Sequence, residues 1–225
     1  MNRIFVNYAN GCRGDFLASC LTKSPKASIL NNLNTLTKIP PLTRQNIKIH
    51  GKLEYGLIHH IKNYPTYFNS WDELFSFINQ ENYLKIKIVA NTVEEIADAA
   101  WLACIKVFLM DNEHKERVKF DEIIPLTKEN VFDNLELLLT RMGHIYKTQN
   151  LDYGYEHEYD HIINFYNLFD VEFIENLYEQ INQEKMGIVR GRTILKNINL
   201  QPKISETEFY PIIKEKYHEL FPRTT

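Results

Sequence analysis

The apolar positions along the first 143 residues alternate between the period of a strand and the period of a helix. Runs rich in β-branched and aromatic residues predict four strands, at 4–8, 46–50, 83–89 and 117–124. Between and after these strands, apolar residues at spacings of three and four predict helices over 16–21, 71–78, 93–108 and 130–142. Strands that alternate with helices in this way favour a parallel sheet covered by helices.

Polar residues at the expected helix ends support these boundaries. Capping boxes, in which a hydroxyl and a carboxylate reciprocally bond free backbone N–H groups, are predicted at 70–73, 92–95 and 205–208. Asp170 is placed to cap a helix that follows it, and Gly143 to end the helix over 130–142. The pattern after residue 143 predicts further helices over 156–168, 171–184 and 206–220.

The predicted fold class is therefore α/β, with three layers in which helices flank a mostly parallel sheet. Residues 1–143 form an α/β domain of nucleotide- or phosphate-binding character, and residues 144–225 form an α-helical extension packed on it.

Charge and cysteine content narrow the class of protein. With 26 basic and 29 acidic residues the chain has a net charge of -3, which argues against generic nucleic-acid binding through neutralised phosphates. Its three cysteines contain no CxxC pair, which is typical of a reducing compartment. The start of the chain has no signal-peptide profile, and its longest apolar stretch, 99–110, is too short to span a bilayer. We expect a cytoplasmic protein without membrane contact.

The segment after the first predicted strand has the arrangement of a phosphate-binding loop. Gly11, Cys12, Arg13, Gly14 and Asp15 separate this strand from a helix. Glycines let the backbone approach an anion, and the first N–H groups of a helix point at it. The GxxxxGK[ST] pattern of nucleotide-binding loops is absent. The carboxylate of Asp15 would repel a phosphate, and it is also well suited to cap a helix. A plain strand-to-helix turn is the alternative interpretation.

The order of segments over residues 1–143 resembles the sulfotransferase superfamily. The matching segments are IFVNYANGCRGDFLASCL, NIKIHG, KIKIVANTVEEIADAAWL, VKFDEIIP and VFDNLELLLTRMG. The resemblance implies a P-loop-like α/β fold that transfers a sulfuryl group from a nucleotide donor, 3′-phosphoadenosine 5′-phosphosulfate (PAPS) or a related adenine nucleotide. The implied acceptor is a hydroxyl of a small molecule or glycan.

The resemblance also implies roles for individual residues. Lys48 and His50 match a Lys-x-His motif whose histidine is the general base on the acceptor hydroxyl, while cations neutralise the leaving group. The 11–15 loop would hold the donor phosphates, with Gly14 in the loop and Arg13 near its basic position. A polar residue at the end of a strand is the alternative interpretation of the histidine.

Three positions depart from the family's pattern. Ala90 stands where the family has an arginine that grips the donor, Asp98 stands where it has a serine, and Asp15 stands where it has a hydroxyl residue. These departures favour another hypothesis, in which the chain keeps the fold and serves as a non-catalytic binding or assembly protein.

A literal HExxH motif in the last third supports a hypothesis of another class. On a helix, His157 and His161 would share one face and ligate zinc, as in zinc-dependent hydrolases, and Glu172, Glu175 or Glu179 could supply a third ligand. The neighbouring charges Glu156 and Asp160 favour the other interpretation, an exposed charged helix start without zinc.

Overall fold

A computed structural model describes the arrangement of most of the predicted elements. It describes residues 3–9, 11–21, 71–80, 82–111, 126–150, 158–188, 191–192, 194–195 and 202–221. The strands predicted at 46–50 and 117–124 and the cap at Ser70 lie outside these residues.

A parallel sheet organises the described residues. Its three strands stand in the order β1 (Arg3–Asn7), β2 (Tyr83–Val89) and β3 (His161–Asn164). Both strand pairs are parallel: Val6 lies opposite Ile86, which in turn lies opposite His161, and the residue numbers of all three strands rise in the same direction. The predicted α/β class with a parallel sheet is confirmed at this level, and β1 and β2 lie where the runs at 4–8 and 83–89 predicted strands.

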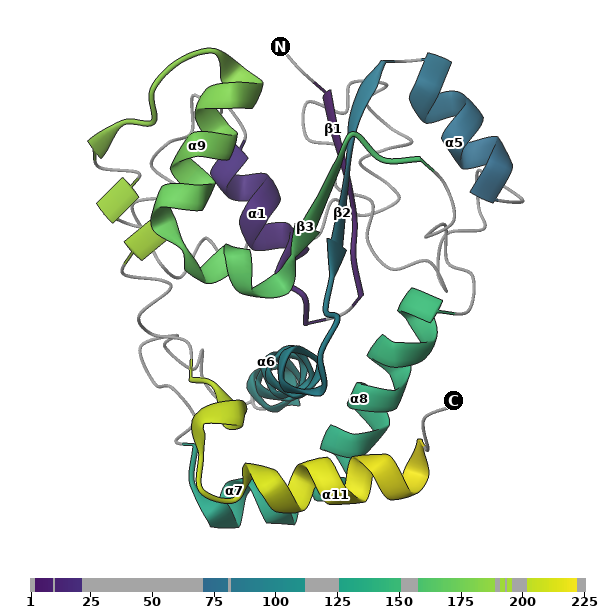
Figure 1. The fold of residues 1–225 in the computed structure, drawn as a ribbon, viewed down its shortest axis with the longest axis vertical. Helices are drawn as coiled ribbons and strands as arrows, with labels where there is room; N and C mark the ends of the chain where they lie inside the picture. The colour runs from purple at the N-terminus through teal and green to yellow at the C-terminus, as the bar shows by residue number, and fades with distance from the viewer. Residues whose placement is uncertain are drawn as a thin grey trace.

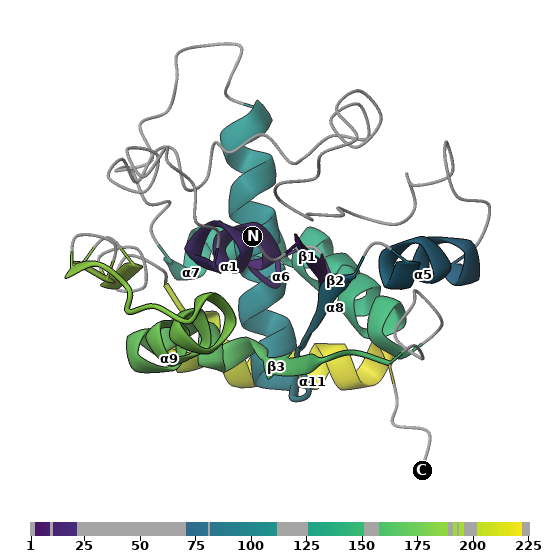
Figure 2. The same ribbon diagram turned by 90° about the horizontal axis from the view of Figure 1, so that it is seen from above.

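Helices lie on both sides of this sheet (Figures 1 and 2). On one side α1 (Gly14–Leu21) and α9 (Val171–Asn182) pack together, and on the other side lie α5 (Trp71–Gln80) and α8 (Leu135–Asn150). The face toward α1 is apolar and carries the buried side chains Ile4, Val6, Ile86, Ile88 and Ile163. Burying these β-branched residues is the main favourable contribution to folding in this region.

The longest helix crosses the carboxyl edge of the sheet. Helix α6 (Val93–Asp111) is separated from the end of β2 by three residues and is seen end-on below the strands in Figure 1. Its capping box is confirmed: Thr92 Oγ1 accepts from the Glu95 N–H at 3.2 Å, and Glu95 Oε2 accepts from the Thr92 N–H at 3.0 Å. The edge at which α/β proteins commonly bind ligands is therefore covered by a helix.

The remaining elements pack around α6 and α8. They are α7 (Lys128–Asp133), the 3-10 helices η3 (Phe165–Phe169) and η4 (Ile204–Glu206), and α11 (Tyr210–Leu220). Thr127 caps α7, and Asp170 caps α9 as predicted. No helix among the described residues is long and apolar enough to cross a membrane.

Three local predictions are wrong. The helix expected over 156–168 is instead extended chain, β3 and η3. Gly143 does not end a helix but lies inside α8, where its missing side chain makes room for the ring of Phe221. Ser205 lies in η4 and does not cap the last helix, which begins at Tyr210 with Pro211 in its first turn. In two of these cases, partners distant in sequence override the local pattern. Residues 161–164 pair with β2, and Ser205 bonds to Asp98.

Candidate functional site

The predicted phosphate-binding loop lies at the carboxyl edge of β1, against α6. Gly11 has a φ of 94°, and a side chain there would overlap the backbone carbonyl of Ala99 in α6. A side chain at Gly14 would overlap the ring of Tyr8. Both glycines thus face the protein's own atoms, and their lack of a side chain permits close packing of the turn. Asp15 is the second residue of α1 and does not occupy its N-cap position.

The cation of this turn is engaged by aromatic rings. The Arg13 guanidinium lies 3.9 Å from the ring centroid of Phe16 and 4.7 Å from that of Phe169, and Nη1 donates to the Leu168 carbonyl at 3.2 Å. Burial lowers the pKa of this guanidinium to about 10. Arg13 therefore joins α1 to the chain segment that leaves β3.

The neighbouring cysteine has the properties of a core residue. Cys12 is fully buried, and its N–H donates to the Ala9 carbonyl at 3.0 Å. Burial raises the pKa of its thiol to about 12. A thiol that holds its proton so firmly is a poor nucleophile.

Backbone donors at the end of β2 also have intramolecular partners. The Ala90 N–H donates to Gln149 Oε1 at 3.2 Å, and the Asn91 N–H donates to Glu95 Oε2 at 2.7 Å. The buried Glu95 carboxylate thus occupies the N-terminal turn of α6, where a bound anion would otherwise be favoured.

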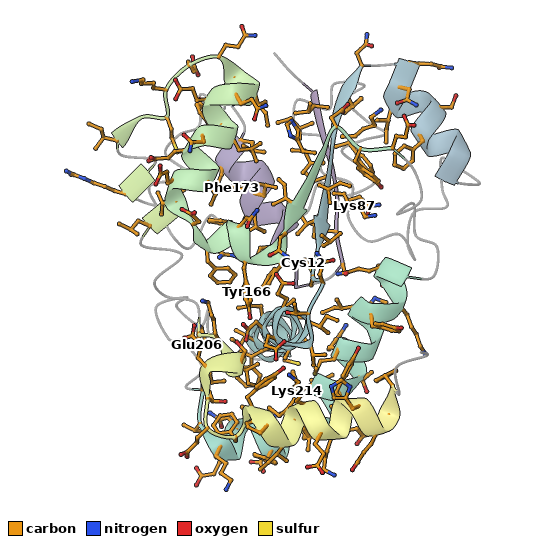
Figure 3. The ribbon with its side chains drawn as sticks, viewed as in Figure 1. Cys12, Lys87, Tyr166, Phe173, Glu206 and Lys214 are labelled. Atoms are coloured by element: carbon orange, nitrogen blue, oxygen red, sulfur yellow. The ribbon has the colours of Figure 1, made fainter. Side chains whose placement is uncertain are left out.

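Asp98, one of the two acids that depart from the family's pattern, is the centre of a buried hydrogen-bond cluster. Its carboxylate accepts from Ser205 N at 2.9 Å, from Ser205 Oγ at 2.7 Å and from Tyr166 Oη at 2.9 Å. Figure 3 shows Tyr166 between α9 and α6. Burial raises the pKa of Asp98, although these three donors oppose the shift. The carboxylate therefore ties η3 and η4 to α6.

Several predicted site residues lie outside the described part of the chain. Lys48, His50 and His157 are among them, so their placement relative to the 11–15 loop stays a prediction. Of the zinc alternative, His161 begins β3 and Glu175 is exposed on α9. Residues 158–161 are not helical, so the shared helix face expected of the two histidines is not formed there. Within the described ranges, no group of three or more metal-ligating side chains is gathered to hold an ion.

Sequence reasoning missed a polar cluster on the sheet face toward α5. Asn7 Nδ2 donates to Tyr159 Oη at 2.6 Å, and Lys87 Nζ lies 5.7 Å from the centroid of the same tyrosine ring. The alternation of β2 placed Lys85 and Lys87 on one face, but only strand register brings Asn7 beside the second lysine.

Comparisons with protein-family models, with curated proteins and with solved structures find no match for this chain.

Proposed function

We propose that the chain is a non-catalytic binding or assembly protein built on an α/β scaffold. Its strand–turn–helix at residues 11–15 keeps the layout of a phosphate loop but serves packing. The observation that carries this proposal is the environment of Arg13, whose guanidinium is held by Phe16, Phe169 and the Leu168 carbonyl.

The groups around this turn support the same function. A nucleotide phosphate at the turn would need space beside Gly11, where even a methyl group would overlap the Ala99 carbonyl, and would approach the Glu95 carboxylate. Two negative charges side by side in a buried place repel each other strongly, because the local dielectric is low. The turn gains more from its intramolecular partners than from an added anion.

The second candidate function is sulfuryl or phosphoryl transfer from a nucleotide donor to a hydroxyl, with His50 as base and Lys48 beside it. One observation favours it: Gly11 and Arg13 lie between the parallel strand β1 and helix α1, whose first residue is Gly14, at the sheet edge where such donors bind. The donor would be PAPS or a related adenine nucleotide.

Titration of the full chain with adenosine 3′,5′-bisphosphate separates the two candidates. We expect no heat of binding and no rise in the unfolding temperature, because the turn's groups are already engaged. Arg13→Met should lower stability by about 2 kcal/mol, since it removes a hydrogen bond and a desolvated cation–π contact. Differential scanning calorimetry with and without the nucleotide measures both effects.

The exposed Arg192 supplies the matched control, because Arg192→Met removes the same charge without a buried contact. Nucleotide-dependent stabilisation of the wild type that Arg13→Met abolishes and Arg192→Met retains would overturn the binding-protein proposal in favour of group transfer. Equal stability of the two variants would remove the structural role assigned to Arg13.

A further inference from the structure

Strand β3 lies at one end of the described sheet. It has β2 as its neighbour on one side, and none of the described strands pairs with its other side. In Figure 1 it is the strand nearest the viewer, and no described helix or strand passes in front of it. Ile162, inside this strand, is 66% exposed. A residue with a strand on each side does not keep that much of its surface in water, so this edge of the sheet is open.

The open edge of β3 lacks the protection that natural sheet edges usually have. An open edge presents backbone N–H and C=O groups to which another strand can add, and charged side chains, proline or a bulge commonly prevent this. Residues 161–164 contain no proline, lysine, arginine or carboxylate. The preceding Asp160 is turned toward β2, since its carboxylate accepts from the Lys85 N–H at 2.7 Å. The edge therefore offers backbone groups beside an exposed isoleucine.

The order of residues along this edge is compatible with a second copy of itself. In an antiparallel pair, directly opposite residues carry their side chains on the same face, and a two-fold axis at one residue pairs it with its own copy. With the axis at Ile162 the two exposed isoleucines meet, and Asp160 lies opposite Asn164 of the second copy. An axis at Asp160 would oppose two carboxylates, and an axis at His161 would set Asp160 opposite the isoleucine.

The state of β3 before association favours a second copy over a free peptide. A peptide that adds to the edge loses backbone entropy, at a cost of about 1–2 kcal/mol for each residue that it orders. A second β3 is already held in the strand conformation by its ladder with β2. Because β3 has only four residues, the few backbone bonds it can form compensate little entropy loss. An ordered strand is therefore the better partner.

We propose that the chain forms a two-fold dimer through the open edges of β3, with the Ile162 side chains of the two copies in contact at the axis. The three described strands of each copy then join into one continuous sheet. A contact made by so short an edge is small, and the dimer is accordingly weak and dependent on concentration. This dimer goes beyond the proposed function and does not involve the 11–15 turn.

Sedimentation velocity of the full chain tests the dimer, at concentrations from about 1 µM to 1 mM to cover weak association. We expect the mass to rise from monomer to dimer over this range. Ile162→Lys should raise the Kd at least about tenfold, because it opposes two like charges and removes the apolar contact. Ile188→Lys is the matched control, since Ile188 is 75% exposed and lies outside the sheet, and should leave the Kd unchanged.

Ile162→Cys tests the position of the axis. Directly opposite residues of an antiparallel pair have Cα atoms about 4.5–5.5 Å apart, within the range that a disulfide spans. Cys12, Cys20 and Cys104 are buried, so the new thiol is the accessible one among the described residues. With oxidised glutathione as the oxidant, we expect Ile162→Cys to form a covalent dimer several-fold faster than Ile188→Cys. Equal rates for the two variants would contradict an axis at Ile162.

Three results of the sedimentation experiment would overturn the dimer itself: a monomer mass at every concentration, a Kd that Ile162→Lys leaves unchanged, or equal losses in Ile162→Lys and Ile188→Lys. Thermal unfolding shows whether each variant folds. Ile162→Thr, which keeps a β-branched side chain without charge, is the second variant should Ile162→Lys fail to fold, and should weaken the dimer several-fold. Failure here is distinguishable from failure of the proposed function, because nucleotide titration and Arg13→Met report on the turn alone.

Discussion

Gly11→Ala is expected to lower the free energy of unfolding by roughly 3 kcal/mol or more. The backbone at this position has a φ of 94°, which costs a residue with a side chain about 1–3 kcal/mol. The added methyl group would also overlap the Ala99 carbonyl, and overpacking typically costs a further 1–3 kcal/mol or so. That carbonyl belongs to helix backbone and cannot rotate away as a side chain could.

Gly187→Ala is the matched control for this substitution. A methyl group there has no atom within 4 Å and the residue is exposed, so the same change in composition should alter stability little. Chemical denaturation of both variants measures the difference. Equal free energies of unfolding for the two variants would show that the turn does not pack closely against α6, and would contradict the packing role assigned to Gly11.

Asp98→Ala is the second substitution with a large expected effect, again about 3 kcal/mol. The carboxylate is 1% exposed and accepts three hydrogen bonds, two from Ser205 and one from Tyr166. Its removal leaves these donors without their acceptor in a buried place, and each such loss costs about 1–3 kcal/mol. Because the cluster joins three elements, we expect the segment around η4 to lose protection against hydrogen exchange first.

Asp98→Asn tests the charge of the same group. Burial raises the folded-state pKa of the carboxyl above its unfolded value, although the Lys203 ammonium opposes this. The native state therefore holds the proton where the unfolded chain has lost it. The protonated carboxyl of Asp98 therefore stabilises the folded wild type fully at a pH below the pKa of the unfolded chain. This contribution is lost as the pH rises through the pKa of the folded state. Asn cannot titrate, so the wild type should lose stability relative to Asp98→Asn across that window. A pH-independent difference would contradict a raised pKa.

Local sequence determined the elements whose contacts are close along the chain. The runs at 4–8 and 83–89 are rich in β-branched and aromatic residues and form β1 and β2, and Thr92 with Glu95 forms the capping box from neighbouring backbone groups. The turn between β1 and α1 could also be predicted, because glycines between a strand and a helix are a local signal for a turn.

For the candidate site, the sequence predicted only where along the chain the turn lies and not what the turn contacts. Gly11 to Asp15 were identified as a turn at the end of a strand, but whether the turn faces an anion or a helix depends on where α6 lies. The partners of Arg13 at Phe169 and Leu168 come from about 155 residues away, and single-sequence patterns carry no information on such pairs.

The sequence by itself therefore determined an α/β fold, the strands β1 and β2 and most of the described helix starts, since these depend on periodicity and on hydrogen bonds within one turn. The tertiary structure decided the rest. Residues 161–164 became a strand because β2 offers them a row of unpaired backbone groups, secured by the bonds between Asp160 and Lys85. Ser205 does not cap a helix, because its hydroxyl donates to the buried Asp98, which lies 107 residues earlier. A buried carboxylate without donors costs more free energy than an uncapped helix end, whose backbone groups can bond to water.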